Sequence, residues 1–407
     1  MSKNKASSGE GSIFKDNSGR WRASITIGKD PLTGGQKKQW FYGKSEKEVR
    51  EKKLKALSQI QNGDYVEPSK ITVEQWFHTW LWEYKKMKLQ STTFESYEYI
   101  IRVHILPLLG KKQLIKLKVE DIQKLYNNKL TSGRLDGQGG LSHRSVKYIH
   151  IIIRQALTQA IKSGLIIKNV SEATTPPKLI KQDMRVLTVQ EQQKFTAAIG
   201  TERLRALFIL APNCGAREGE ILALKWNDVD FQQNKIRIDE TIKRVKTFNS
   251  SGNKTELIFK TPKTSSSNRT IGIPQLVMNE LYQHKIKQNE EKLKAGSLYI
   301  DNNLVFCTEL GKPIDVSSLM RVYKRILKRS DIDIKGVTFH TLRHVFGSRL
   351  NDLNIDIKTI QSLMGHSSIK TTMDVYVHPS EEKQKEAADK MNSLYAGMIK
   401  ENYILYS

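Results

Sequence analysis

Two adjacent prolines, Pro176 and Pro177, divide this chain into parts that do not share one continuous helix or sheet. The residue before a proline is pushed out of the helical region, and paired prolines stiffen the chain in an extended form. A helical pattern ends before them at Gly164, and the capping-box sequence of 188–191 opens another helix after them. The chain has 407 residues, enough for two or three domains of ordinary size. We therefore interpret residues 174–178 as a linker between domains.

The N-terminal segment alternates apolar and polar residues in the manner of a small sheet. Residues 21–27 alternate strictly, and residues 37–42 supply a second clear strand. Ser45, with Glu48 three residues later, predicts a capping box at the start of a charged helix over 46–61. The pattern predicts a three-stranded sheet with one helix. Its basic face could enter a DNA major groove, or could simply be solvated.

Helical periodicity dominates between this segment and the proline pair. Apolar residues recur three and four positions apart, which is typical of helices that bury one face. The predicted helices start at Thr72 and cover 92–105, 119–130 and the stretch from Ser142 to Gly164, with Pro107 as a stop. We expect a helical-bundle core from these stripes.

Mixed patterning follows the linker. Helices are expected at 189–199, 203–213 and 217–225, strands at 235–244, 256–261 and 268–273, and then helices again. The fold class is therefore multidomain α+β: a small three-stranded sheet plus helix, a helical bundle, and a mixed but mainly α domain. The expected domains are residues 1–65, 66–178 and 179–407, the last with a C-terminal tail helix.

A formal charge of +25 and a pI near 9.7 point to a polyanionic partner, most commonly nucleic acid, although a diffusely basic soluble protein is the alternative. Two cysteines far apart exclude a disulfide framework and a zinc site. No apolar run resembles a signal sequence or a membrane span, so we expect a cytoplasmic protein. A lone basic residue is often ordinary surface, but the following could line a duplex: Arg20, Arg22, Lys37, Lys38, Lys85, Lys86, Lys88, Arg144 and Lys147.

Six residues carry the chemistry that this sequence suggests. Two arginines, a lysine and two histidines can surround a phosphate and neutralise its growing charge without any metal, and a tyrosine beside them is a plausible covalent nucleophile. An arginine three residues after a histidine shares its helix face, so both can aim at one phosphate. The six are Arg217, Lys263, His340, Arg343, His366 and Tyr376. This inventory favours phosphoryl transfer on DNA.

The strings around these residues resemble the tyrosine recombinase family, the integrases of temperate phages and conjugative transposons. The segment 215–228 is similar to the family's first conserved box, and 340–344, 363–366 and Tyr376 to the second. The segment 260–274 is similar to its lysine-bearing β-hairpin. Cys214, where many members have threonine, is a modest departure. Residues 70–175 resemble the core-binding (SAM-like) domain, and residues 11–62 the arm-binding domain of larger integrases.

The resemblance implies a site-specific recombinase that cleaves and rejoins DNA through a 3′-phosphotyrosine. Tyr376 would be the nucleophile, His340 an acid, base or positioning group, His366 a hydrogen-bond donor to the scissile phosphate, and Lys263 the acid for the departing 5′-oxygen. Glu220 would brace the site rather than react. No cofactor is implied, because the phosphotyrosine stores the bond energy. Alternatives with the same site are a Xer-type recombinase that resolves chromosome dimers and a type IB topoisomerase; a further one is a DNA-binding regulator without catalysis.

The implied partners are double-stranded DNA at core-type and arm-type attachment sites and three further copies of the chain. An excisionase and a host DNA-bending protein are further candidates. The last segment supports the oligomer, because Ala387, Met391, Leu394, Tyr395 and Met398 form one apolar helical stripe. Such a stripe needs a partner surface, either in its own catalytic domain or, as the resemblance favours, in a neighbouring protomer of a closed ring.

Overall fold

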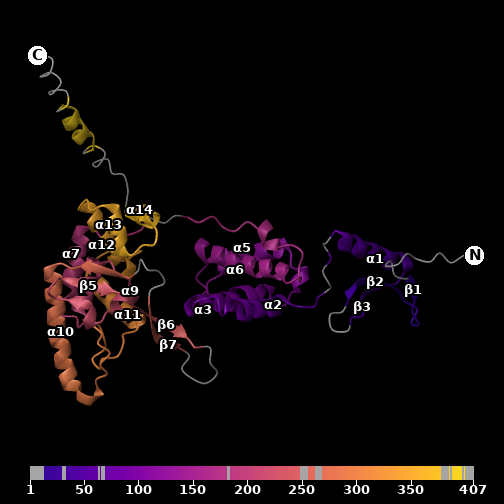
Figure 1. Ribbon diagram of the computed structural model, residues 1–407, viewed down its shortest axis with the longest axis horizontal. Coiled ribbons are helices and arrows are strands. Elements are labelled where there is room, and N and C mark those ends of the chain that lie inside the picture. Colours follow the sequence, from indigo (N-terminus) through magenta and orange to yellow (C-terminus); the bar gives the residue numbers. More distant parts are fainter. Residues whose placement is uncertain are drawn as a thin grey trace, which may run out of the picture. The chain divides into compact units, whose positions relative to one another are not determined.

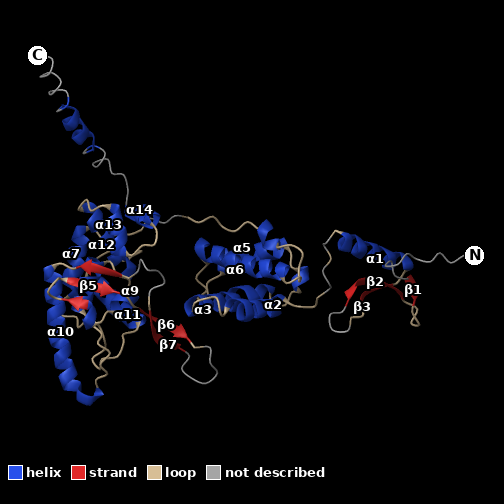
Figure 2. Cartoon of the chain, viewed as in Figure 1, coloured by secondary structure: helices blue, strands red, loops and turns tan. Residues whose placement is uncertain are grey.

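The computed structural model describes residues 13–29, 34–62, 65, 69–180, 184–247, 255–261, 268–376, 385, 387–396 and 398. The chain divides into two compact units, residues 1–181 and 182–407. The first unit contains a small sheet with a helix and a helical bundle, and the second is mainly helical with short strands (Figures 1 and 2). Within the described ranges, no helix is both long and apolar enough to cross a membrane.

The N-terminal sheet consists of three antiparallel strands in the order β1-β2-β3, as predicted. They are β1 (Ile13–Lys15), β2 (Trp21–Lys29) and β3 (Gln36–Gly43), and α1 (Glu46–Gln61) contacts all three (Figure 1). Ala23 and Ile25 are buried, as are Val49 and Ala56 of α1. Cross-strand partners share a face of a sheet. Arg22 therefore lies on the face opposite Ala23, with Tyr42, Trp40 and Lys38.

The start of α1 differs from the predicted capping box in one bond. Ser45 does cap the helix, because its hydroxyl accepts from the amide of Glu48 at 3.2 Å. The Glu48 carboxylate, however, accepts from the amide of Lys44 at 2.9 Å, one residue before the cap. The return bond of a capping box is therefore replaced by one that ties down the end of β3.

A helical bundle occupies the rest of the first unit. It comprises α2 (Val73–Thr79), α3 (Ser91–Ile100), α4 (Leu106–Leu109), α5 (Val119–Ser132) and α6 (His143–Lys162), with π-helical stretches at Trp80–Lys85 and Ile101–Ile105 and 3₁₀ turns at Leu114–Lys116 and Val170–Ala173. The predicted stop at Pro107 was wrong. Proline lies in the first turn of α4, where a missing N–H costs no helical hydrogen bond. The chain therefore stays helical through it.

The predicted linker at 174–178 overlaps a stretch, residues 175–180, that is neither helix nor strand. Its first residues are nevertheless held by the bundle. The amide of Thr175 donates to Gln123 Oε1 at 2.9 Å, and the carbonyl of Lys178 lies 3.0 Å from His143 Nδ1.

The second unit begins with α7 (Val189–Ile199), which has the predicted capping box between Thr188 and Glu191. It continues through α8 (Arg205–Cys214), α9 (Glu218–Ala223), a 3₁₀ turn (Trp226–Asp228), β4 (Val229–Asp230), β5 (Lys235–Ile238), β6 (Thr241–Lys246), β7 (Thr255–Lys260), β8 (Arg269–Gly272), α10 (Gln275–Ala295), a 3₁₀ turn (Gly296–Leu298), α11 (Val316–Arg329), α12 (Phe339–Asp352), α13 (Ile357–Met364) and α14 (Ile369–Tyr376). Residues 387–396 are also helical.

The single strand expected at 235–244 is two strands in two sheets. β5 lies between β4 and β8, whereas β6 pairs with β7 in a separate two-stranded sheet. One core joins the helices around these strands, with stacked and edge-on contacts among Phe195, Phe208, Tyr323 and Phe339. α12 packs against α8 and contacts α13 and α14. This packing brings residues of α9, α12, α13 and α14 to one place.

Candidate active site

The turn between α8 and α9 presents the first arginine of the site. Gly215 ends α8 in the left-handed region, with φ of 58°. A Cβ at this position would lie 2.4 Å from the ring of Phe346 and 2.9 Å from the sulfur of Met364, so only glycine fits without movement. Arg217 follows, immediately before α9, with 41% of its side chain exposed. Its guanidinium is therefore accessible to a ligand.

Glu220, the residue expected to brace the site, is buried beside Arg217. Its side chain is 4% exposed, and Oε1 accepts from Nη1 of Arg217 at 2.6 Å while Oε2 accepts from the Arg217 amide at 3.0 Å. Burial alone would raise the pKa of this carboxyl, but Arg269 and Arg217 outweigh burial and hold the pKa below its ordinary value. Glu220 is thus a buried carboxylate that fixes the direction of Arg217.

Arg269 completes this ion-pair network and was absent from the predicted site. It lies at the start of β8 and is 7% exposed. Its Nη2 donates to Glu220 at 2.9 Å, and its Nε donates to the carbonyl of Leu363 at 2.7 Å. Arg269 therefore connects the strand after the expected lysine hairpin to the end of α13. The sequence pattern offered one weak signal, the alternation of 269–272 as a strand.

Arg343 occupies the centre of the cluster from α12. It is 2% exposed, and its Nη1 donates to the carbonyl of Gly215 at 2.6 Å while its Nη2 donates to the carbonyl of Met364. Its Nε is buried without a hydrogen-bond partner among the described residues. Burial, and then Arg217, lower the pKa of Arg343 to about 10, so the guanidinium stays charged near neutrality.

Two histidines flank Arg343 on α12. The rings of His340 and His344 meet edge to face, with centroids 4.7 Å apart. Burial lowers the pKa of His340, and Arg343 and Arg217 lower it further. Burial and then His340 lower the pKa of His344 to about 4. Both imidazoles are therefore neutral near pH 7, and they act as hydrogen-bonding groups rather than as cations.

His366 enters the cluster just after Gly365, which ends α13 in the left-handed region with φ of 63°. Its Nδ1 lies 2.9 Å from the hydroxyl of Thr372, a fully buried residue of α14. Burial and then Arg343 lower the pKa of His366 to about 4. The Nε2 of a neutral His366 is left for another partner.

Tyr376, the last residue of α14, is 5% exposed. Its hydroxyl lies 3.1 Å from Nδ1 of His344, and its ring is parallel to that of His366 at 6.5 Å. Gly347 of α12 leaves room for the ring, since a Cβ there would lie 2.4 Å from Cζ of Tyr376. Burial raises the pKa of the phenol above its ordinary value, although Arg343 opposes the rise. The hydroxyl is therefore protonated in the free protein.

Five of the six predicted residues thus gather from the start of α9, from α12, from the turn after α13 and from α14, while Lys263 lies outside the described residues. Charge interactions link Arg217, Arg343, His340 and His366, and Arg343 also acts on Tyr376. Sequence reasoning missed His344, Thr372 and Arg269. Within the described part of the chain, no group of His, Cys, Asp and Glu could hold a metal ion.

Among the residues of the N-terminal sheet that were predicted to contact DNA, Arg22 is held in place by aromatic rings. The guanidinium of Arg22 lies 4.4 Å from the ring centroid of Phe14 and 5.2 Å from that of Trp40, and its Nε is buried without a hydrogen-bond partner among the described residues. Lys37 and Lys38 are exposed, and exposed Arg20 bonds to the hydroxyl of Ser18.

The predicted contacts of the helical bundle are of two kinds. Lys85 is half-buried, with its ammonium 2.8 Å from Gln155 Oε1 and 5.2 Å from the Trp80 ring, and burial lowers its pKa. This lysine is held within the bundle and is less available than its neighbours. Lys86, Lys88 and Arg144 are exposed, and Lys147 is half-buried.

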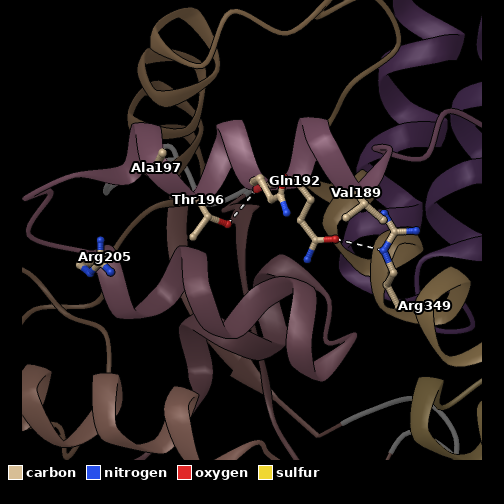
Figure 3. A pocket seen from close by; sticks show the side chains of 7 residues that line it. Val189, Gln192, Thr196, Ala197, Arg205 and Arg349 are labelled. Carbon is tan, nitrogen blue, oxygen red and sulfur yellow. Dashed lines mark hydrogen bonds between the residues drawn. The ribbon is translucent and has the colours of Figure 1, made fainter. Parts of the chain in front are cut away.

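A separate hollow of about 680 Å³ lies along α7, lined by Val189, Gln192, Gln193, Thr196, Ala197, Arg205 and Arg349 (Figure 3). Its two arginines are already engaged. Arg205 bonds to Glu280, and Arg349 bonds to Gln192, Asp352 and the carbonyl of Leu187. None of the predicted catalytic residues lines it.

Comparison with known proteins finds two family models that match parts of this chain. Residues 185–383 match the Phage integrase family, and residues 72–130 match the Phage integrase N-terminal SAM-like domain. The chain is 34% identical over 387 residues to a protein named tyrosine recombinase XerC-like of Caldanaerobacter subterraneus, covering 92% of this chain and 96% of that one. It is 26% identical to the ICEBs1 integrase of Bacillus subtilis, covering 94% and 100%.

The fold is also that of lambda integrase. A structure of a lambda integrase tetramer bound to a Holliday junction covers 91% of this chain and 96% of that chain with a TM-score of 0.55 at 20% identity. The sequence matches over nearly the whole length, the match to the SAM-like domain and the cluster of residues around Arg343 all indicate the same family. The chain belongs to the tyrosine recombinase family, the phage integrases.

Proposed function

We propose that this tyrosine recombinase integrates and excises a mobile element by cutting and rejoining DNA at attachment sites. The observation that carries the proposal is the cluster of Arg217, Arg343, His340 and His366 around the buried Tyr376. Arg217 is partly exposed, and the buried Nε of Arg343 has no hydrogen-bond partner among the described residues. In the proposal, both guanidinium groups donate to the non-bridging oxygens of one phosphate.

In the proposed reaction, Tyr376 Oη attacks the scissile phosphorus and gives its proton to a general base, the role that the family resemblance offers to His340. The bond from phosphorus to the 5′-oxygen breaks, and Lys263 protonates that oxygen as it leaves, a role that rests on the family resemblance. The neutral His366 donates one hydrogen bond to the phosphate, so the arginines and Lys263 supply the positive charge. Since the phenol is protonated in the free protein, deprotonation is coupled to DNA binding, and the reverse attack by the 5′-hydroxyl rejoins the strand without a cofactor.

The first unit would supply the DNA contacts. On the N-terminal sheet we propose the face that carries Arg22, Trp40 and Lys38 as the reader of arm-type sites, because aromatic rings hold the Arg22 guanidinium in place. On the bundle, exposed Lys86, Lys88 and Arg144 are the candidates for contacts to the core-type site. The division into domains at 65 and 178 follows the same proposal.

A homotetramer on DNA is the proposed active form. The described part of the tail exposes its apolar stripe, with Met391 at 49%, Leu394 at 53%, Tyr395 at 56% and Met398 at 49%. A helix that exposes such a stripe suits docking on another surface, and a neighbouring protomer is the occupant that we propose. On the family resemblance alone, we add an excisionase and a host DNA-bending protein as partners, and the cytoplasm as the place of action.

The decisive experiment measures covalent adducts on nicked attachment-site DNA. Tyr376→Phe is expected to abolish the adduct while leaving DNA affinity within a few-fold, because phosphate contacts dominate binding. Tyr282→Phe is the matched control, since Tyr282 is exposed on α10 and lies outside the cluster. Normal adduct from Tyr376→Phe would remove Tyr376 as nucleophile. The absence of adduct from the wild-type protein would favour a DNA-binding regulator without catalysis.

A further inference from the structure

Helix α14 carries two hydroxyls that face histidines of other segments. Tyr376 Oη lies 3.1 Å from Nδ1 of His344, and Thr372 Oγ1 lies 2.9 Å from Nδ1 of His366. Residues four apart lie on one face of a helix, so docking of that face forms both bonds together. Tyr376 is 5% exposed and Thr372 fully buried, which places both contacts away from water.

Each hydroxyl restricts the proton position on the histidine that it meets. A neutral imidazole has one N–H and one acceptor nitrogen, and the partner of one nitrogen decides which is which. His366 can donate from Nε2 to a phosphate only if its Nδ1 is the acceptor, which requires the hydroxyl of Thr372 to donate. Likewise, a protonated phenol is the natural donor to Nδ1 of His344. Both assignments require neutral rings, and burial together with Arg343 keeps them neutral.

Few other described groups could hydrogen-bond to the hydroxyl of Tyr376 or to Nδ1 of His366. The ring of His344 contacts the ring of His340, with centroids 4.7 Å apart, and also contacts Tyr376. Among the described residues, His344 is the one whose side chain hydrogen-bonds to the hydroxyl of Tyr376. His366 stacks parallel to Tyr376 at 6.5 Å, and its Nδ1 meets only α14 through Thr372 in the same described part of the chain.

We propose that Thr372 and His344 are positioning residues of strand transfer: Thr372 sets the tautomer of His366, and His344 holds the hydroxyl of Tyr376. Packing of α14 against the site therefore positions two groups at once: the nucleophile Tyr376 and His366, which would donate a hydrogen bond to the phosphate. The proposal deepens the recombinase mechanism and rests on it for the role of His366. The histidine in contact with the nucleophile is thus His344. It lies one helical turn beyond His340, to which the resemblance gave an acid, base or positioning role.

The first test uses variants of Thr372 in the full chain. Thr372→Val keeps the shape and removes the hydroxyl, and Thr372→Ser restores the hydroxyl with less packing. In single-turnover cleavage of nicked site DNA, Thr372→Val is expected to be slower by about 10- to 100-fold, because a misplaced proton on His366 removes one hydrogen bond from Nε2 to the charged phosphate. Thr372→Ser is expected to recover most of the rate, and affinity for one half-site should not change. Wild-type rate in the valine variant, or equal loss in the serine variant, would overturn the role of the hydroxyl.

A second readout needs no DNA and separates this proposal from the recombinase mechanism. In full-length protein labelled with ¹⁵N-histidine, the ring nitrogens of His366 should show a single Nε2–H tautomer, and Thr372→Val should give a mixture. A single unchanged tautomer in the variant would refute the assignment even if cleavage fails for another reason. For His344, an Asn side chain keeps an acceptor near the Nδ1 position and Phe does not. His344→Asn should cleave faster than His344→Phe, and equal rates would remove His344 from the proposal.

Discussion

Replacing Glu220 by Gln is the substitution whose effect on the free energy of unfolding can best be estimated from the structure. The carboxylate is 4% exposed and lies between the guanidinium of Arg217, whose side chain is 41% exposed, and that of Arg269, whose side chain is 5% exposed. The amide keeps the shape but presents an NH₂ group to one of two cations. Leaving the buried Arg269 charge uncompensated costs about 3–5 kcal/mol, whereas the more exposed Arg217 pair adds about 0–1 kcal/mol at most. This is a large part of a typical stability of about 5–15 kcal/mol.

Urea titration followed by ¹⁹F NMR of 5-fluorotryptophan measures this loss in the intact chain. Trp226 is the one tryptophan in residues 182–407, so its resonance reports on the second unit, and Trp226→Phe assigns it. Glu218→Gln is the matched control, because it removes a carboxylate from the same turn of α9 at a half-buried position. We expect the control to change the unfolding free energy by less than about 1 kcal/mol.

The double variant tests the cause of the loss. If the cost comes from the lost ion pair between Glu220 and the buried Arg269, adding Arg269→Met to Glu220→Gln should recover much of it. A loss below about 1 kcal/mol in Glu220→Gln, or a double variant equal to the sum of the single ones, would refute the reasoning.

The same pair predicts a pH dependence. The pKa of Glu220 in the folded chain is held below the ordinary 4.5. Its stabilisation is therefore fully present above pH 4.5, the unfolded value, and is lost as pH falls through the folded pKa. The difference in unfolding free energy between wild type and Glu220→Gln should shrink below pH 4.5 and stay constant above it.

Three other outcomes follow from the structure. Gly215→Ala should lower stability by about 1–3 kcal/mol, because the added Cβ meets Phe346 and Met364 at a left-handed position; an unchanged urea midpoint would contradict this. Deleting residues 1–65 should spare cleavage of a minimal core site but prevent integration between full attachment sites, and a truncated chain that integrates normally would exclude an arm-reading sheet. Truncation after Pro379 should weaken tetramers on a Holliday junction in sedimentation while leaving half-site binding intact; tetramers of full stability would mean that the tail packs on its own domain.

Local patterns were sufficient for most of the elements. The capping box at Thr188, the stripe of the long helix from Ser142 and the alternation in β2 depend on neighbours within a few residues, so their structure follows from the chain itself. The elements that were predicted wrongly take their structure from groups farther along the chain. Pro107 lies where a helix tolerates proline, and β5 and β6 separate because each has a different partner strand.

The sequence by itself determined which chemistry this protein carries. The motifs around Arg217, His340, Arg343, His366 and Tyr376 supply the groups that we propose to react, because arginine forks bind phosphate oxygens and a phenol can act as a covalent nucleophile.

Only the tertiary structure decided how those groups are held. Arg269 reaches Glu220 from a strand 49 residues away, His344 meets Tyr376 from 32 residues away, and Arg343 meets the carbonyl of Gly215 across 128 residues. Spacing along a chain does not reveal such contacts. They arise because burial forces each polar group to find a partner on whichever element packs against it.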